Sequence, residues 1–169
     1  MSMSGGKSDV KVAFITDEIA ADPDGISASA QVANNAALVI GGALHSGNAI
    51  ALAGAARKIE ITSGGDDSGI SFTIVGTGIN GDAITESLTG GNSATATSTN
   101  FFRTIASITA VGDPAGTVVA GTTTSAAEVV NVERTRLKGY LIVSGGTAGV
   151  VEFFDGDPNN SGSALFKAR

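Results

Sequence analysis

The chain has 169 residues, a formal net charge of −6 at pH 7 and no cysteine. This length suits one domain with a small appendage, and the absence of cysteine excludes disulfides, thiolate metal ligands and thiol catalysis. Direct nucleic-acid binding needs a basic patch, whereas the 10 lysines and arginines here are scattered along an acidic chain.

The low content of charge predicts assembly. Only 15% of the residues are charged, whereas glycine alone accounts for 24 positions. A monomeric domain usually covers its surface with more charge than this. We therefore expect an obligate oligomer or a component of a larger assembly, with part of the surface facing another protein.

The N-terminal segment has two interpretations. Alternation in Val10–Ile15 predicts a short strand, and the acidic residues 16–25 predict a loop or an extended arm. The strand belongs either to the main sheet, which is the simpler reading, or to an arm that adds to a neighbouring subunit. Residues 1–25 are accordingly predicted to form an N-terminal arm.

No targeting or membrane segment is expected. Met1–Lys7 is small and polar and lacks the apolar centre of a signal peptide. The longest apolar runs, such as Asn35–Leu44, are too short and are interrupted by glycine. We expect a protein made in the cytoplasm, without a membrane partner.

The alanine-rich stretch Ile26–Leu44 favours two strands over a helix. Alanine favours helix, but the pairs Asn34-Asn35 and Gly41-Gly42 are poor helix residues. We predict two strands joined by a turn at the asparagines, and a further strand over Asn48–Ala53.

Residues 57–122 carry the strongest pattern. Short apolar alternations stand between turn clusters rich in Gly, Asn and Asp, which indicates half-buried strands joined by tight turns. The pattern predicts a β-meander whose inward residues are Ile59, Ile61, Ile70, Phe72, Ile74, Ile84, Leu88, Phe102, Ile105, Ile108 and Val111.

The C-terminal part reads as further strands. Thr117–Ala120 belongs to the main domain of residues 26–123, and residues 124–169 follow it. Four more strands are expected at Ala127–Val132, Leu137–Ser144, Val150–Asp155 and Ala164–Phe166. A small group of strands is unstable alone, so we expect residues 124–169 to close the sandwich or to form an intersubunit contact. The predicted fold is all-β, an antiparallel β-sandwich or distorted barrel of roughly eight to ten strands.

The loop Asp155–Gly162 is the segment whose oxygen-bearing side chains are spaced most like those of a metal-binding loop. Oxygen side chains stand at alternate positions, as in the first half of a calcium loop. The bidentate glutamate expected at its twelfth position is Phe166, and Pro158 separates the candidate ligands. We interpret the segment as a hairpin loop and predict no metal or other cofactor.

No catalytic constellation is visible. Asp66-Asp67-Ser68-Gly69 is interpreted as a turn in which the aspartates cap local N–H groups. His45 has no nucleophile or acid at a telling spacing, and no G-x-S-x-G elbow is present. A glycosidase pair among the strand glutamates lacks the aromatic platforms that bind sugars, since the chain has no tryptophan. These glutamates are Glu18, Glu60, Glu86, Glu128, Glu133 and Glu152. We predict that the protein is not an enzyme.

The phenylalanines provide the best hint of an interface. Phe14, Phe72 and Phe166 are expected in the core, whereas adjacent residues on a strand face opposite sides. The rings of two adjacent phenylalanines are therefore both shielded from water only where the sheet is covered on both faces, by a second layer or by a neighbouring subunit. This applies to Phe101-Phe102 and to Phe153-Phe154.

The densest basic groups are interpreted as structural. These are Arg57-Lys58 and the segment Arg134–Lys138. We read them as charges on edge strands that discourage unwanted pairing, not as a nucleic-acid patch.

Part of the chain resembles structural proteins of tailed-bacteriophage virions. The resemblance runs from about Gly25 to about Gly121 and is carried by RKI at 57–59, DDSG at 66–69, ISFTIVGT at 70–77, NGD at 80–82, ITESLTG at 84–90 and FFRTIASIT at 101–109. It implies a virion location, with the major capsid protein or other virion proteins as partners. The primary expectation is a capsid decoration (cement) protein, acting as a homo-oligomer, with a trimer as the first guess. A neck or tail adaptor, a fibre-base component and a host-surface binding module are the alternatives.

Overall fold

The computed structural model describes residues 20–46, 49–51, 55–127, 151–155, 159 and 163–168. The regular structure in these ranges is β-strand throughout, which confirms the all-β class. The strands are β1 (Asp22–Gln31), β2 (His45–Ser46), β3 (Ala49–Ala51), β4 (Ala56–Ser63), β5 (Ser71–Thr77), β6 (Ala83–Thr89), β7 (Thr95–Thr97), β8 (Thr104–Val111), β9 (Thr117–Ala127), β10 (Val151–Asp155) and β11 (Ser163–Ala168).

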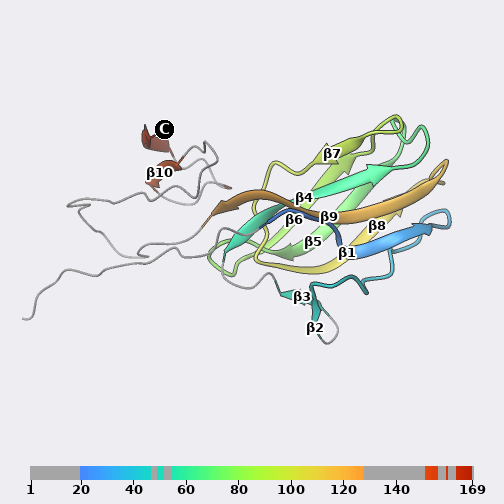
Figure 1. Ribbon diagram of the computed structural model, residues 1–169, viewed down its shortest axis with the longest axis horizontal. Coiled ribbons are helices and arrows are strands. Elements are labelled where there is room, and N and C mark those ends of the chain that lie inside the picture. The colour runs from blue at the N-terminus through green and yellow to red at the C-terminus, as the bar shows by residue number, and fades with distance from the viewer. Residues whose placement is uncertain are drawn as a thin grey trace, which may run out of the picture.

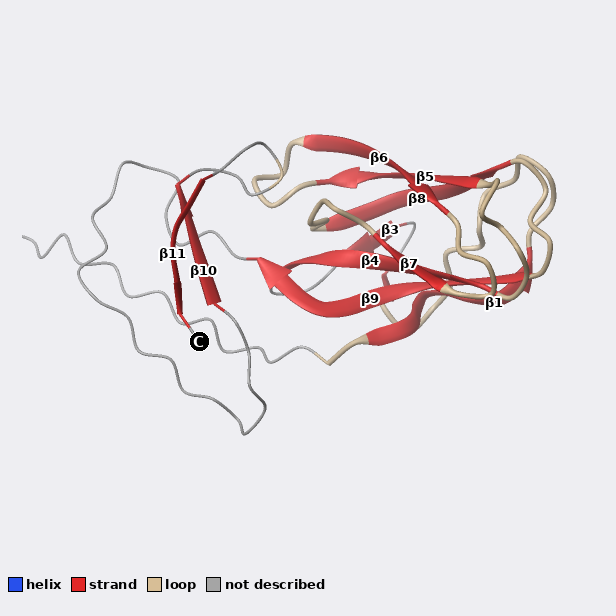
Figure 2. Cartoon of the chain, turned by 90° about the horizontal axis from the view of Figure 1, so that it is seen from above, coloured by secondary structure: helices blue, strands red, loops and turns tan. Residues whose placement is uncertain are grey.

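Two antiparallel sheets form a sandwich. Sheet A has the strand order β1-β9-β4-β7, and sheet B has the order β2-β3-β8-β5-β6. Strands β5, β6 and β8 lie together on one side, and strands of sheet A lie on the other (Figures 1 and 2). Neither sheet closes on itself. The described residues therefore form a β-sandwich, and the barrel alternative is wrong.

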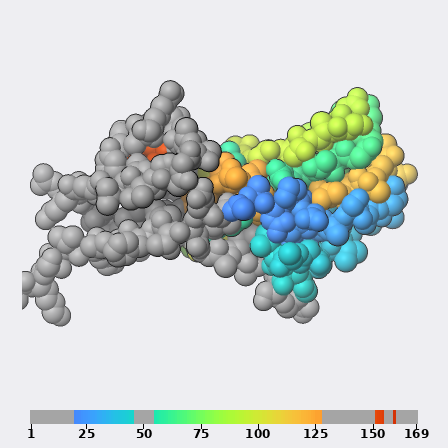
Figure 3. Space-filling model, in the orientation of Figure 1, coloured from blue at the N-terminus to red at the C-terminus, as the bar shows by residue number. Residues whose placement is uncertain are grey.

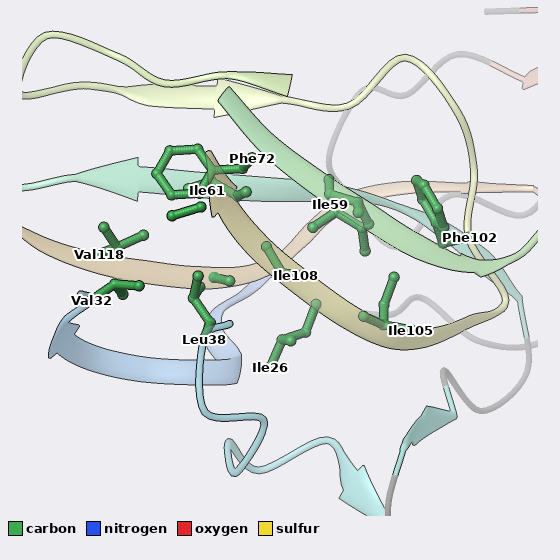
Figure 4. Packing of buried hydrophobic residues seen from close by; sticks show 13 residues of the cluster. Ile26, Val32, Leu38, Ile59, Ile61, Phe72, Phe102, Ile105, Ile108 and Val118 are labelled. Atoms are coloured by element: carbon green, nitrogen blue, oxygen red, sulfur yellow. The ribbon is translucent and has the colours of Figure 1, made fainter. Parts of the chain in front are cut away.

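The core lies between the two sheets. Apolar side chains from both sheets point inward and meet there, at alternate positions along β4 and β5 (Figure 4). Full burial of one such apolar side chain contributes about 1.5–3 kcal/mol to folding. The buried cluster contains Ile26, Val32, Leu38, Ile59, Ile61, Phe72, Ile74, Phe102, Ile105, Ile108, Ala110, Val118 and Ala120.

The predicted meander is wrong in its pairing, although its strands exist. Strand β4 lies in sheet A, β5 and β6 in sheet B, β7 in sheet A, β8 in sheet B and β9 in sheet A. Only the β5–β6 hairpin in this region pairs consecutive strands. Alternation specifies which face is buried but not which strand lies alongside, so the sequence pattern could not distinguish a meander from crossings between sheets.

Val111 was expected inside and is instead 52% exposed. The register between β5 and β8 shifts between Val75 and Gly76, so that two β8 residues oppose one position of β5. This bulge lets Ile105 and Ile108 both point inward at a spacing of three. Normal alternation then resumes, which directs Ala110 inward and Val111 outward.

The N-terminal part of the sandwich confirms the asparagine turn, but the second strand predicted within Ile26–Leu44 is wrong, since only an isolated bridge follows the turn. Asn35 has φ of 55°, a conformation that asparagine tolerates better than most residues. After this turn the chain runs along β8, where Ala37 forms a bridge with Thr109. Strand β1 begins at Asp22, so the last residues of the expected arm lie in sheet A. The predicted strand Val10–Ile15 lies outside the described residues.

The C-terminal strands β10 and β11 pair with each other and with neither sandwich sheet. Strand β9 runs without a break to Ala127, past the expected domain boundary at residue 123. An intersubunit role for the β10–β11 hairpin stays a prediction. The strand expected at Leu137–Ser144 and the basic segment Arg134–Lys138 lie outside the described residues.

Candidate interaction surface

The outer face of sheet B carries no charged side chain on β5, β6 or β8. Opposed residues form cross-strand rows, for example Ser87 and Thr109 on either side of Thr73. Val75 and Val111 add exposed apolar area at 36% and 52% exposure. This outer face of sheet B consists of Ser71, Thr73, Val75, Thr77, Ala83, Thr85, Ser87, Thr89, Thr104, Ser107, Thr109 and Val111.

The outer face of sheet A differs because it is charged. Lys58 and Glu60 point outward from β4, which lies between β9 and β7. Figure 3 shows β1 in blue, β9 in orange and β4 in green side by side on this side of the molecule. Partial burial disfavours the ionised carboxylate and raises the pKa of Glu60 above its usual value. Thr62 continues this row and shares a hydrogen bond of 2.7 Å with Thr95 through their hydroxyl oxygens.

Arg57 corrects the interpretation of the Arg57-Lys58 pair. Strand β4 has a neighbour on each side, so it is not an edge strand. Arg57 is only 5% exposed and donates from Nη1 to the Ala20 carbonyl at 3.2 Å and to Thr122 Oγ1 at 3.1 Å. Its guanidinium therefore ties the start of β1 to β9, a structural role that sequence spacing did not indicate.

Glu86 points inward from β6, and both of its carboxylate oxygens accept hydrogen bonds. Its Oε1 accepts from the Thr99 N–H at 2.7 Å, and its Oε2 accepts from the Asn100 N–H at 3.0 Å. The carboxylate thereby fastens β6 to the segment that precedes β8. Glu60 points outward from the other sheet, so these two carboxylates do not form a glycosidase pair.

Of the remaining glutamates, one lies in the described part of the chain. Glu152 is exposed on β10, and Glu18, Glu128 and Glu133 lie outside the described residues.

Asp66 and Asp67 have different roles. Asp66 Oδ1 accepts from the N–H and hydroxyl of Ser68, the local turn that was predicted, and these hydrogen bonds lower the pKa of Asp66. Asp67 is fully buried, and its Oδ1 accepts from the Ala115 N–H at 2.7 Å. It therefore joins the β4–β5 and β8–β9 loops, a long-range contact that the local turn reading missed.

Phe101 and Phe102 face different surroundings, as expected for neighbours in an extended chain. Phe102 is fully buried in the core, and its backbone pairs with that of Arg57. The Phe101 ring lies 5.3 Å from Lys58 Nζ, a cation–π contact. Asn159 hydrogen-bonds to the backbone of Phe101.

The second phenylalanine pair is more open. Phe154 on β10 is 38% exposed, and Phe153 is half-buried. An exposed phenylalanine on a two-stranded hairpin suits an intersubunit contact, which stays a prediction. Phe166 lies in β11, and Phe14 lies outside the described residues.

Most of the candidate metal loop Asp155–Gly162 lies outside the described residues. Asn159 uses its side-chain oxygen for the Phe101 N–H. Across the described ranges, no group of three or more histidines or carboxylates could hold a metal ion. His45 is exposed on β2.

No family model, curated protein or solved structure matches this chain. The class that the coordinates define is an antiparallel β-sandwich with one uncharged outer face. In the part of the chain with assigned structure, no helix is long and apolar enough to cross a membrane.

Proposed function

We propose that this protein is a non-enzymatic structural component of a tailed-phage virion, most specifically a capsid decoration protein. The observation that carries the proposal is the outer face of sheet B, where β5, β6 and β8 present serine, threonine, alanine and valine without a charged side chain. A surface of this kind loses little hydration when another protein covers it. The resemblance of residues 25–121 to virion proteins supplies the biological setting.

The mechanism of a decoration protein is mechanical. Contacts spread over several shell subunits add binding free energy only while those subunits keep their mature spacing, so binding stabilises the mature shell by linkage. The net charge of −6 fits the outside of the shell better than contact with packaged DNA. Partners in this proposal are the major capsid protein and further copies of this chain.

Copy number in purified virions tests the proposal. The protein is measured by quantitative mass spectrometry against the major capsid protein of the same particles. Hundreds of copies support decoration of the shell, whereas a dozen or fewer would favour the neck or tail adaptor. Absence from particles would overturn the virion role and leave a host-surface binding module to be tested by binding to cells.

Truncation tests the expected N-terminal arm. The deletion should end at residue 19, because the Ala20 carbonyl accepts a hydrogen bond from buried Arg57. Weaker attachment to shells with an unchanged melting temperature would support an arm that contacts a neighbour. Unchanged attachment would contradict it.

A further inference from the structure

Among the described residues, strand β6 is a long and regular edge of the sandwich. The edges of sheet A are β1 and β7, and those of sheet B are β2 and β6. Strands β7 and β2 have only three and two residues. Strand β1 has two register shifts, and residues 41–44 cover part of it, since the N–H of Gly41 donates to the Ile26 carbonyl and that of Leu44 to the Gly25 carbonyl. Strand β6 extends over seven residues, Ala83–Thr89, and β5 is the one described strand that pairs with it.

The hydrogen-bond pattern shows which β6 groups point outward. The hairpin pairs Ile70 with Gly90 and Gly78 with Asp82 through backbone hydrogen bonds of 2.9 and 2.8 Å. In an antiparallel ladder, bonded and non-bonded pairs alternate. The N–H and C=O groups directed away from β5 are therefore those of Ala83, Thr85, Ser87 and Thr89, and these four residues are all exposed.

This edge lacks the usual protection against strand addition. Natural edge strands are commonly blunted by outward charges, proline or a bulge. The β5–β6 register is regular along its whole length, and the outward side chains of β6 are uncharged. The one acid, Glu86, points inward and is held by two backbone N–H groups.

We propose that β6 pairs with β6 of a second copy of this chain, in antiparallel register about a two-fold axis at Ser87. This register places Thr85 beside Thr89 of the partner subunit and Glu86 beside Leu88 of the partner subunit. The neighbouring register, with its axis at Glu86, would set two carboxylates directly opposite each other, which is unfavourable. The pair continues sheet B and its uncharged outer face across both copies. It goes beyond the proposed function, because pairing through β6 holds whether or not the protein belongs to a virion.

A cysteine cross-link tests the register. Directly opposed residues in an antiparallel pair have Cα atoms about 4.5–5.5 Å apart, within the range that a disulfide spans. The chain has no cysteine, so Ser87→Cys introduces the sole thiol. Under mild oxidation this variant should form a covalent dimer, whereas Thr85→Cys, offset from its own copy along the strand, should not.

Thr73→Cys separates edge pairing from stacking of the outer faces. Thr73 lies beside Ser87 on the central strand β5, where only face-to-face contact could bring two copies together. A dimer formed by Thr73→Cys as fast as by Ser87→Cys would overturn edge pairing. Failure of Ser87→Cys to form a covalent dimer would also overturn edge pairing.

Sedimentation provides the second readout. The unaltered full-length chain should have at least twice the 16.6 kDa chain mass, and Ser87→Lys should lose the β6 contact and sediment at half the mass of the unaltered chain. Position 87 is exposed in a single copy, so Ser87→Lys should leave the sandwich folded. A cooperative thermal unfolding transition of this variant checks that it does. A monomeric unaltered chain, or Ser87→Lys with unchanged mass, would overturn the proposal. A trimer would also overturn it, because two-fold pairing would leave one of the three β6 edges unpaired.

Discussion

The side-chain amide of Asn159 pairs with both backbone groups of Phe101. Its Oδ1 accepts from the Phe101 N–H at 2.7 Å, and its Nδ2 donates to the Phe101 carbonyl at 2.8 Å. The amide reproduces the two-bond pattern of an antiparallel strand pair. Because Asn159 lies between β10 and β11, this contact links the C-terminal hairpin to the segment that enters β8.

Asn159→Ala should loosen this link. Loss of two hydrogen bonds removes about 0.5–1.5 kcal/mol each, and the loss falls on the hairpin contact, not on the core. Hydrogen exchange measured by mass spectrometry should rise over residues 151–168, while the melting temperature of the sandwich changes little. Asn34→Ala, at an exposed turn position, is the control. Unchanged exchange over the hairpin in Asn159→Ala would contradict the role of this contact.

Asp67 and Asp66 form a matched pair for mutation. Asp67→Ala should lower the free energy of unfolding by about 1–3 kcal/mol, because it removes a buried acceptor and releases the Ala115 N–H. Asp66→Ala removes a carboxylate at an exposed local turn and should change the free energy of unfolding much less than Asp67→Ala does. Urea unfolding measures both. Equal losses for the two variants would show that Asp67 does not hold the loops together.

Arg57 and Lys58 allow the same comparison for basic residues. Arg57→Ala should lower the free energy of unfolding by about 2–4 kcal/mol, since it removes charged hydrogen bonds and buried packing. Lys58→Ala loses a half-buried cation–π contact with Phe101 and should lower it by less than about 1 kcal/mol. Thermal unfolding distinguishes them, and a larger effect for Lys58→Ala would contradict the assignment of Arg57 as the structural residue.

Glu60 should make stability depend weakly on pH. Burial raises its folded pKa above the unfolded value of 4.5. Between these two values the folded chain binds more protons at this site than the unfolded chain, so stability falls as pH rises through that window. Glu60→Gln should remove this slope and slightly stabilise the chain at neutral pH. The effect is small, because Glu60 is only half-buried and remains in contact with water.

Urea unfolding at pH values on both sides of the window checks this prediction. Glu152→Gln, at an exposed position on β10, makes the same charge change and is the control. A slope in Glu60→Gln equal to that of the unaltered chain would assign the pH dependence to other groups.

Several features were predictable because they are local. Alternation at Ile59 and Ile61 reports which face of β4 is buried, whatever the neighbouring strand is. The asparagine turn was predictable because Asn35 tolerates positive φ. The Asp66 turn was predictable for the same reason, because its hydrogen-bond partner Ser68 lies only two positions away.

The candidate surface needed the fold. Ser87, Thr73 and Thr109 are ordinary polar residues in the sequence and become one uncharged row only when β6, β5 and β8 lie side by side. The open edge at β6 likewise depends on strand order, since nothing within Ala83–Thr89 distinguishes an edge strand from a central one.

The sequence by itself determined an all-β chain, the strands from Ile59 to Ile74 and their turns, and mostly these inward residues, because side-chain periodicity and turn chemistry act over a few residues. The tertiary structure decided the sheet order, the bulge that turns Val111 outward and the burial of Arg57 and Asp67. These features depend on partners far away in the chain, such as Thr122 for Arg57 and Ala115 for Asp67. Local patterns carry no information about such partners, so only the packed sandwich reveals them.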